Sequence, residues 1–355
     1  MDVEVFSHFE LPGHLRSHLN TELDGMGVAK MQRTLQHFSS RVSYNHECIL
    51  RAKNLFTSEH ERVEHEQREN TQLIVLPITF VLRSTEKIQE GIIHSCDINP
   101  TNTLMSAGGV DGLSVLNMSG KKHFFRSFTS PVRDCSFCPE YNYIIASLES
   151  SRSQLIDLET QHTTQTFTGH AGSVYCNAVH PTLPLFFSGG RDGAVCAFDL
   201  RQGKPTQRLY SARCPVLSLA ASLFYVVAGD QDGNVHHFDL RSPNKPIVDT
   251  SGVRPIRKII SASHTSFSVI DSQKIRQYYR GNEYRSKDLP NSVVTGCYNT
   301  EDGSTMLFNL KEGIRLDSDL EIDGSYHMGA NACVFDKTCE RLFLFDRKGT
   351  LRVYE

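Results

Sequence analysis

The residues of this chain best suited by type to chemistry are its 16 histidines and 10 cysteines. Only Cys135 and Cys138 have the Cys-x-x-Cys spacing of a metal or redox site. A zinc site would need a second cysteine pair, or histidines at ligand spacing, nearby in the sequence, and none is found. Residues three apart in a strand also point to opposite faces. We therefore expect reduced thiols in a folded core, with no bound metal or cofactor.

The histidine and glycine pairs give no stronger sign of catalysis. His60 and His65 fall in a strongly charged stretch, where we expect solvated side chains. His236 and His237 are adjacent in a predicted strand, so their side chains face opposite ways. The glycine pairs at 108–109 and 189–190 precede Asp-Gly turns, not the Gly-Lys-Ser/Thr of a phosphate loop. The sequence contains no recognisable nucleophile–base or paired-carboxylate arrangement, which favours a non-catalytic protein.

The overall composition is that of an ordinary globular chain. Of its 355 residues 39% are hydrophobic and 22% are charged, and the net charge is −3. This balance gives no global attraction to nucleic acid or to anionic membranes. No apolar run approaches the ~18 residues of a membrane span, and the acidic start Met1–Glu4 is unlike a signal peptide. We expect a cytosolic or nuclear protein without membrane contact.

A repeated segment indicates the architecture that must position these residues. The tetrapeptide Phe-Asp-Leu-Arg occurs at 198–201 and again at 238–241. Each copy follows an apolar pair, small residues and an Asp-Gly turn, and the two copies are one period of ~40 residues apart. Self-similarity at this period is typical of the four-stranded blade of a β-propeller.

We expect seven such blades in a propeller domain of residues 71–355. Their predicted starts are Ile92–Asn99, Val132–Cys138, the segment after Gly169-His170, Val216–Ala220, Ile256, Val293 and Ala332–Phe335. The last strand, Thr350–Glu355, leaves the seventh blade one strand short. An upstream strand would complete it and remove an exposed edge, and the apolar, β-branched segment Leu73–Leu82 is the candidate.

The third predicted blade resembles a WD repeat, although the match is degenerate. His170, Ser188 and Asp192 fit the buried His, Ser/Thr and Asp of that repeat, and Asp232 is the counterpart of Asp192 in the next blade. Phe198 stands where the repeat has tryptophan, so the indole N–H donor is lost. These four polar residues are predicted to be structural.

Residues 28–70 carry a seven-residue period. Val28, Leu35, Val42, Ile49, Phe56 and Val63 are spaced by seven, with Met31, Phe38, Asn45 and Ala52 between them. This pattern predicts an α-helical coiled-coil stalk before the propeller. Gly25-Met26-Gly27 separates it from a short N-terminal helix within residues 1–27. The alternative is an amphipathic helix that folds onto its own propeller. The residues predicted for oligomerisation are Leu35, Phe38, Val42, Tyr44, His46, Ile49, Arg51 and Phe56.

The segments Leu11–Leu19 and Tyr44–Arg51 resemble the pre-mRNA-processing factor nineteen family, the WD-repeat scaffold of the spliceosome's Nineteen Complex. Tyr44, His46, Glu47 and Arg51 match a Tyr-x-His-acidic step and a downstream Arg in that family's tetramerising coiled coil. The resemblance implies a nuclear homo-oligomer, a tetramer, that recruits splicing-complex proteins. Family members normally begin with a U-box for ubiquitin transfer. Only residues 1–10 precede the match here, so we expect a reduced member without ligase activity of its own.

The fifth predicted blade is locally basic and contains tyrosines. Positive charge combined with aromatic surface suits single-stranded RNA. An acidic protein partner, or an ordinary polar rim, would fit the same residues. The candidate partner or RNA surface consists of Arg254, Arg257, Lys258, Arg276 and Arg280.

Other functions remain open at this point. The paired aromatic-Asp-x-Arg endings, at Arg201 and Arg241, resemble the box by which substrate receptors of cullin-type ubiquitin ligases dock their adaptor, and would predict a monomer. A helix followed by a propeller, with the phrase Thr166–His170, also fits a G-protein β-like subunit in a 1:1 coiled coil with a small partner. The enzyme-class alternative is a ubiquitin ligase subunit whose U-box is missing here.

Overall fold

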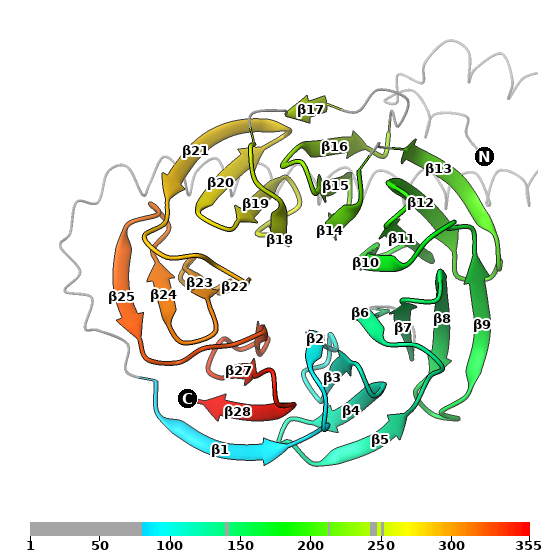
Figure 1. Cartoon of the computed structure of the whole chain (residues 1–355), viewed down its shortest axis with the longest axis horizontal. Coiled ribbons are helices and arrows are strands. Elements are labelled where there is room, and N and C mark those ends of the chain that lie inside the picture. The colour runs from blue at the N-terminus through cyan, green and yellow to red at the C-terminus, as the bar shows by residue number, and fades with distance from the viewer. Residues whose placement is uncertain (1–79, 139–141, 212–213, 242–246, 250–251) are drawn as a thin grey trace, which may run out of the picture. The chain divides into compact units, whose positions relative to one another are not determined.

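Every regular element that the structure describes is a β-strand. The computed structural model describes residues 80–138, 142–211, 214–241, 247–249 and 252–355. These residues form seven four-stranded antiparallel sheets around a central axis (Figure 1). The predicted seven-bladed β-propeller is thereby confirmed. The chain divides into two units, Met1–Leu76 and Pro77–Glu355, and the predicted short helix and coiled-coil stalk lie outside the described residues.

Each blade has the same order of strands from the axis outward. The innermost strands are β2 (Ile93–Ile98), β6 (Val132–Phe137), β10 (Val174–Val179), β14 (Val216–Ala221), β18 (Ile256–Ser261), β22 (Thr295–Tyr298) and β26 (Ala332–Phe335). The second strands are β3 (Leu104–Gly109), β7 (Tyr143–Leu148), β11 (Leu185–Gly190), β15 (Tyr225–Asp230), β19 (Ser266–Asp271), β23 (Thr305–Phe308) and β27 (Leu342–Phe345). The predicted blade starts agree with these innermost strands to within a few residues.

The third strand of most blades is largely buried, whereas the outermost strand is mostly exposed. The third strands are β4 (Leu113–Asn117), β8 (Arg152–Asp157), β12 (Ala194–Asp199), β16 (Val235–Asp239), β20 (Lys274–Tyr279), β24 (Gly313–Leu316) and β28 (Thr350–Tyr354). The outermost strands are β5 (Lys122–Arg126), β9 (Thr163–Thr168), β13 (Pro205–Ser211), β17 (Ile247–Asp249), β21 (Asn282–Asp288), β25 (Ile322–Tyr326) and β1 (Leu82–Lys87).

The ring is closed by an upstream strand, as expected, but a different one from the segment we predicted. β1 pairs antiparallel with β28 and completes the seventh blade. It covers residues 82–87, so it shares only Leu82 with the predicted segment 73–82, and residues 73–79 lie outside the described residues. The physical reason is position. An outermost strand has solvent on its outer side, so the polar sequence Leu-Arg-Ser-Thr-Glu-Lys suits it and a continuous apolar run is not required.

The apolar core lies between neighbouring blades. Ile93 of the first blade packs in one cluster with Phe343 and Phe345 of the seventh, and the other clusters repeat this sharing. Within blade three, Phe198 is buried and stacks on Phe186 at a centroid distance of 4.9 Å. Such an aromatic pair contributes about 0.5–1.5 kcal/mol beyond area burial. The phenylalanine therefore fills the place where tryptophan was expected, through packing alone.

The segments that lead into the innermost strands and the turns between the second and third strands lie on the same face of the ring. The Glu90 and Gly91 N–H groups, before β2, donate to Asp111 Oδ2, in the turn between β3 and β4, at 2.9 and 3.0 Å. The Ala171 N–H, before β10, donates to Asp192 Oδ2 in the same way at 2.8 Å. We call this the mouth face, because the innermost strands begin here. The face where they end is the opposite face.

Candidate functional site: the mouth of the central channel

The second residue of the innermost strand is bulged in five blades. In β2 the register shifts between Ile93 and Ser95, and it shifts at the same place in β6, β10, β14 and β18. A bulge leaves one residue outside the ladder and re-aims its side chain. The bulged residues are His94, Arg133, Tyr175, Leu217 and Arg257.

These side chains gather around the axis. Val294 and Asn331 take the corresponding places just before β22 and β26. All seven line a cavity of about 480 Å³ in the central channel, and we call them the mouth ring. The lining also includes Asp97, Asp134 and Lys337, which follows the end of β26 at the opposite face. The repeat thus places one variable side chain per blade at a common opening.

Two carboxylates below the ring hold neighbouring blades together. Asp97 accepts the Ile98 N–H at 2.9 Å and, across the blade boundary, the Phe137 N–H at 2.8 Å. Asp134 does the same with its own neighbour Cys135 at 3.0 Å and with Asn177 of blade three at 2.8 Å. All four carboxylate oxygens therefore already accept backbone N–H groups. Burial raises the pKa of both carboxyl groups.

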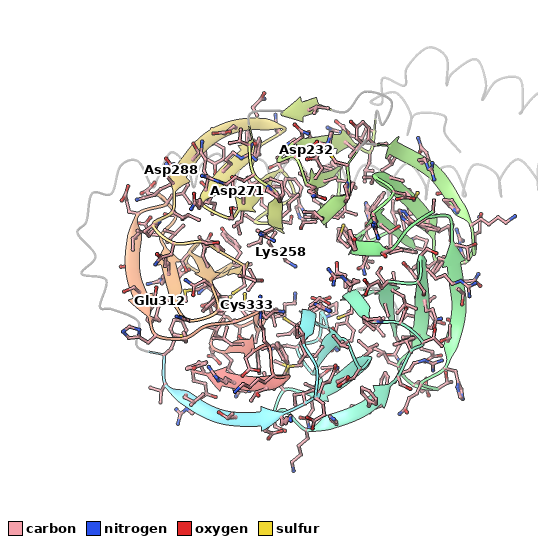
Figure 2. The ribbon with its side chains drawn as sticks, in the orientation of Figure 1. Asp232, Lys258, Asp271, Asp288, Glu312 and Cys333 are labelled. Carbon is pink, nitrogen blue, oxygen red and sulfur yellow. The ribbon has the colours of Figure 1, made fainter. Side chains whose placement is uncertain are left out.

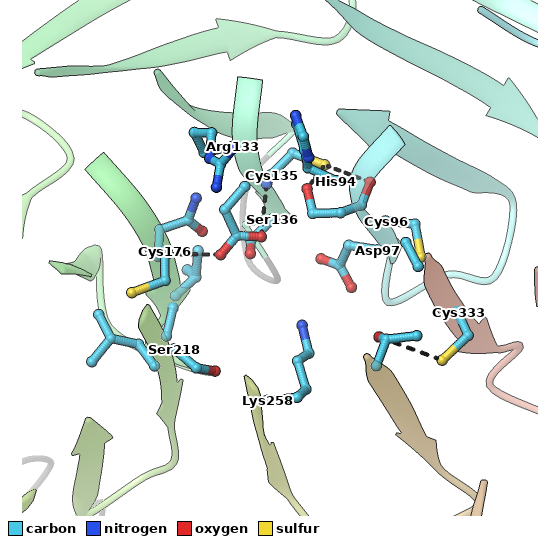
Figure 3. A pocket seen from close by; sticks show the side chains of 18 of the residues that line it. His94, Cys96, Asp97, Arg133, Cys135, Ser136, Cys176, Ser218, Lys258 and Cys333 are labelled. Atoms are coloured by element: carbon cyan, nitrogen blue, oxygen red, sulfur yellow. Dashed lines mark hydrogen bonds between the residues drawn. The ribbon is translucent and has the colours of Figure 1, made fainter. Parts of the chain in front are cut away.

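Lys258 is a further cation in the lining of the channel. It follows the bulged Arg257 in β18 and reaches into the central opening, where Asp97 lies across from it (Figures 2 and 3). Burial alone would lower its pKa, but the negative charge of Asp134, helped by Asp97, outweighs this and raises the pKa. The ammonium is therefore charged at neutral pH, so Lys258 is an anion-binding group and not a base.

Two further ring members modify the charge of the mouth. Burial lowers the pKa of His94, and the positive charge of Arg133 lowers it further, so the imidazole is neutral at pH 7. The Arg133 guanidinium lies over the Tyr175 ring, 5.3 Å from its centroid. The mouth therefore carries fixed positive charge from arginine and lysine, and it combines this charge with an aromatic surface.

The predicted blade-three residues form one hydrogen-bonded chain. His170 Nδ1 lies 2.9 Å from Asp192 Oδ1, and Nε2 lies 2.7 Å from Ser188 Oγ. Because a carboxylate only accepts, Nδ1 carries the proton, while Nε2 is within hydrogen-bond distance of the serine hydroxyl. Burial would raise the pKa of Asp192, but the bonds from Ala171 N–H and His170 lower it. This chain joins the segment before β10 to the turn before β12.

Blade four uses a different acid from the one predicted. Asp232 is exposed, whereas Asp230 is buried and lies 3.1 Å from His236 Nε2. Asp230 also accepts the Asn234 N–H at 2.8 Å and the Asp232 N–H at 3.0 Å. Blade three has Gly190 at the position that corresponds to Asp230. In blade four the buried acid is therefore the last residue of β15, from which it reaches His236 in β16.

The five basic residues predicted as one partner surface do not lie together. Arg276 is buried and donates to the Gly233 carbonyl at 3.1 Å. Lys258 and Arg257 line the channel, and Arg280 lies over the Tyr279 ring. Only Arg254, Arg257 and Arg280 are exposed. The β18 cations face the channel while Arg276 of β20 lies inside the blade, and a count of charge along the sequence cannot show this difference.

The paired Arg201 and Arg241 lie at the opposite face, at the ends of β12 and β16. Arg201 is bound by Asp199 at 2.8 and 2.6 Å, and Arg241 by Asp239 at the same two distances. Arg241 additionally donates to the Tyr225 hydroxyl at 3.1 Å and lies over the Phe224 ring. The two arginines are thus displayed in matching geometry on adjacent blades.

The Cys-x-x-Cys residues are both buried. Burial raises the pKa of each thiol to about 12, although Ser106 and Ser95 contact the sulfur of Cys135 at 3.3 Å. Among the described residues no group of three or more histidine, cysteine or acidic residues could hold a metal ion. The residues predicted for oligomerisation, from Leu35 to Phe56, lie outside the described residues.

The mouth ring is the feature that sequence reasoning missed. The sequence does carry a signal for it, a tripeptide pattern that recurs every ~40 residues. Its copies are Ile-His-Ser, Val-Arg-Asp, Val-Tyr-Cys, Val-Leu-Ser and Ile-Arg-Lys. Each triplet is a β-branched residue, the bulged residue and a third residue that returns to the ladder. Reading one blade alone would not separate this triplet from ordinary strand alternation.

Comparison with known proteins agrees with the geometry. Residues 161–199 match the family described as WD domain, G-beta repeat, a segment that contains the His170–Ser188–Asp192 chain. The match covers one repeat, from β9 to the end of β12, within the seven-bladed propeller. In the described part of the chain, no helix has the length and apolarity needed to cross a membrane.

Individual relatives are similar over a short segment. THO complex subunit 6 of Homo sapiens is 35% identical over 71 residues, 20% of this chain, and its homolog in Rattus norvegicus gives the same figures. DmX-like protein 1 of Mus musculus is 37% identical over 78 residues, 21% of this chain. The matched segment spans 21% of the THO subunits and 3% of the DmX-like protein.

Proposed function

We propose that this chain is a non-catalytic scaffold of a nuclear mRNA-processing assembly, which recruits protein partners at the mouth of its propeller. The observation that carries the proposal is the mouth ring. A bulge repeated in five blades aims one side chain per blade at a single opening, and blade-to-blade bonds from Asp97 and Asp134 fix its shape. A rigid, pre-formed surface binds with little loss of conformational entropy, as a recruitment site requires.

Two similarities support the nuclear part of the proposal. Segments 11–19 and 44–51 resemble the pre-mRNA-processing factor nineteen family, and the matched relatives include a protein named as a subunit of the THO complex. Both point to membership of a multiprotein assembly. In this proposal the splicing complex supplies the partners and the nucleus is the location.

A tagged pull-down of the full chain from nuclear extract tests this assignment, with proteins and RNA read from the same eluate. The proposal expects splicing-complex proteins together with small nuclear RNAs. Recovery of a cullin adaptor, or of a small coiled-coil partner without RNA, would contradict it.

Self-association through residues 28–70 is the second part of the proposal. Several propellers on one stalk would turn weak contacts into avid binding. We expect Ile49→Asp to abolish the oligomer, because a charge in an apolar seam is costly to desolvate. Light scattering should show a tetramer for the wild-type chain and a monomer for the variant, with an unchanged melting temperature for the propeller. Equal masses for the two would overturn this part.

One observation favours a second candidate function, that of a substrate receptor for a cullin-type ligase. Arg201 and Arg241 are held in matching ion pairs on one face of adjacent blades. A docking site for an adaptor would use both arginines. Replacing them with alanine should then remove the adaptor from the pull-down while recovery of mouth-bound partners is unchanged.

A further inference from the structure

Cations outnumber carboxylates in the lining of the central channel. Arg133, Arg257, Lys258 and Lys337 all line the cavity. The acidic residues in the lining are Asp97 and Asp134, and their oxygens already accept four backbone N–H groups. These carboxylates brace the blades, and backbone hydrogen bonds leave their charge in place. Four cations against two carboxylates still give the lining an excess of positive charge.

The Lys258 ammonium lies in the negative field of Asp134 and Asp97, but the described residues give it no direct bonding partner. Among the described residues it has neither a hydrogen bond nor an ion pair within 4.0 Å. It extends toward the axis from a strand at the wall of a cavity of about 480 Å³, large enough for a carboxylate-bearing side chain (Figure 3). A charged group in a partly closed cavity gains from a bound counter-charge more than an exposed one does, since water screens it less.

We propose that the channel mouth binds an acidic peptide segment of the recruited partner, with one glutamate or aspartate carboxylate reaching Lys258. Two arginines of the mouth ring contact the neighbouring acidic residues of that segment. They are Arg257, which precedes Lys258 in β18, and Arg133 in β6. Tyr175, beside Arg133, offers an apolar surface to the peptide backbone. This inference rests on the proposed recruitment role of the mouth and names the chemistry of the partner.

The choice of an acidic side chain over RNA follows from the shape of the site. The cations line a central cavity, whereas RNA needs a groove that follows its backbone and exposed rings for its bases. The exposed tyrosines Tyr279 and Tyr284 lie in β20 and β21, away from the cavity lining. A single inserted carboxylate fits one central ammonium better than a chain of phosphates does.

Fluorescence anisotropy with a labelled oligoglutamate peptide and the full chain tests this proposal, with oligolysine as the charge control. Lys258→Met should weaken oligoglutamate binding about tenfold or more, the usual effect of losing a charge-assisted hydrogen bond. Lys258→Arg should retain most of the affinity. Lys121→Met makes the same charge change on the opposite face and should leave binding within about twofold, because Lys121 does not line the channel.

Each outcome decides the question. Failure of oligoglutamate to bind, or equal binding by wild type and Lys258→Met, overturns the proposal. A phosphopeptide that competes far better than oligoglutamate would replace the carboxylate by a phosphate and also overturn it. If Lys258→Met melts early, Arg257→Gln, at an exposed residue, gives the same reading. A pull-down that still depends on the mouth ring while oligoglutamate fails would leave the recruitment role intact and reject only the acidic partner.

Discussion

Blades three and four share a repeated sequence pattern, but different buried hydrogen-bond networks stabilise them. In blade three, His170 comes from the segment before the innermost strand and bonds to Asp192 in the turn and to Ser188. In blade four, Asp230 and His236 belong to adjacent strands of the same sheet, and the segment before the blade has no histidine. The shared turn and strand pattern therefore fixes the blade, while the buried polar network differs from one repeat to the next.

The largest effect should come from the more deeply buried acid. Asp230 is 1% exposed and accepts hydrogen bonds from Asn234, Asp232 and His236. Asp230→Ala leaves these donors without an acceptor, so we expect a loss of about 3–5 kcal/mol in the free energy of unfolding. Urea denaturation followed by circular dichroism would measure it. A smaller loss of unfolding free energy for Asp230→Ala than for Asp192→Ala in blade three would contradict this ranking of the two blades.

The equivalent change in blade three should cost less. The Asp192 side chain is 12% exposed, so water can replace part of what is lost. Asp192→Ala should lower the free energy of unfolding by about 1–3 kcal/mol, mainly by releasing Ala171 N–H and His170. Ser188→Ala serves as the control, because it removes the far end of the chain and leaves the carboxylate bonds in place.

Acid should affect blade four through the same carboxylate. Hydrogen bonds from His236 and Asn234 outweigh burial and lower the pKa of Asp230 to about 2. A depressed pKa contributes stability above the unfolded value, which is lost as the pH falls from about 4 toward about 2. The difference in unfolding free energy between wild type and Asp230→Asn should therefore shrink by about 2 kcal/mol between pH 7 and pH 2. A difference independent of pH would show that the carboxylate is not the titrating group.

The smallest effects should come from the two arginines at the opposite face. The Arg201 side chain is 75% exposed, so Arg201→Ala should cost less than about 1 kcal/mol. Arg241→Ala should cost slightly more, because that side chain also lies over Phe224 and bonds to Tyr225. Equal melting temperatures for the two variants would mean that these extra contacts contribute nothing measurable.

The repeat period was enough to predict the fold, because turns and alternation recur in every blade. It predicted the seven blade starts and the residues of the His170–Ser188–Asp192 chain. It did not place the closing strand, since an outermost strand is recognised by its pairing with β28 and not by its own apolarity. It also took Asp232 for the structural acid of blade four, because the repeated pattern aligns that residue with Asp192 and the sequence does not show which acid is buried.

The residues of the candidate site could be grouped correctly only from the three-dimensional structure. Lys258 and Arg276 are both cations of blade five, yet one reaches the channel and the other lies inside the blade. The bulges that aim His94 and Arg133 at the axis change the register by one residue, and register is set by pairing with the neighbouring strand. Counting charged residues along the sequence grouped Lys258 with Arg276, which the sheet separates. The same count overlooked His94 and Arg133, which the ring of blades brings together.

The central claim is that partners are recruited at the mouth ring. The most direct test compares pull-downs of Arg133→Ala/Arg257→Ala with those of Lys121→Ala/Lys204→Ala, which remove the same charge at the opposite face. With melting temperatures matched to wild type, we expect the first variant to lose most co-purifying protein and the second to retain it. Equal recovery by both variants would contradict the account and place recruitment elsewhere on the chain.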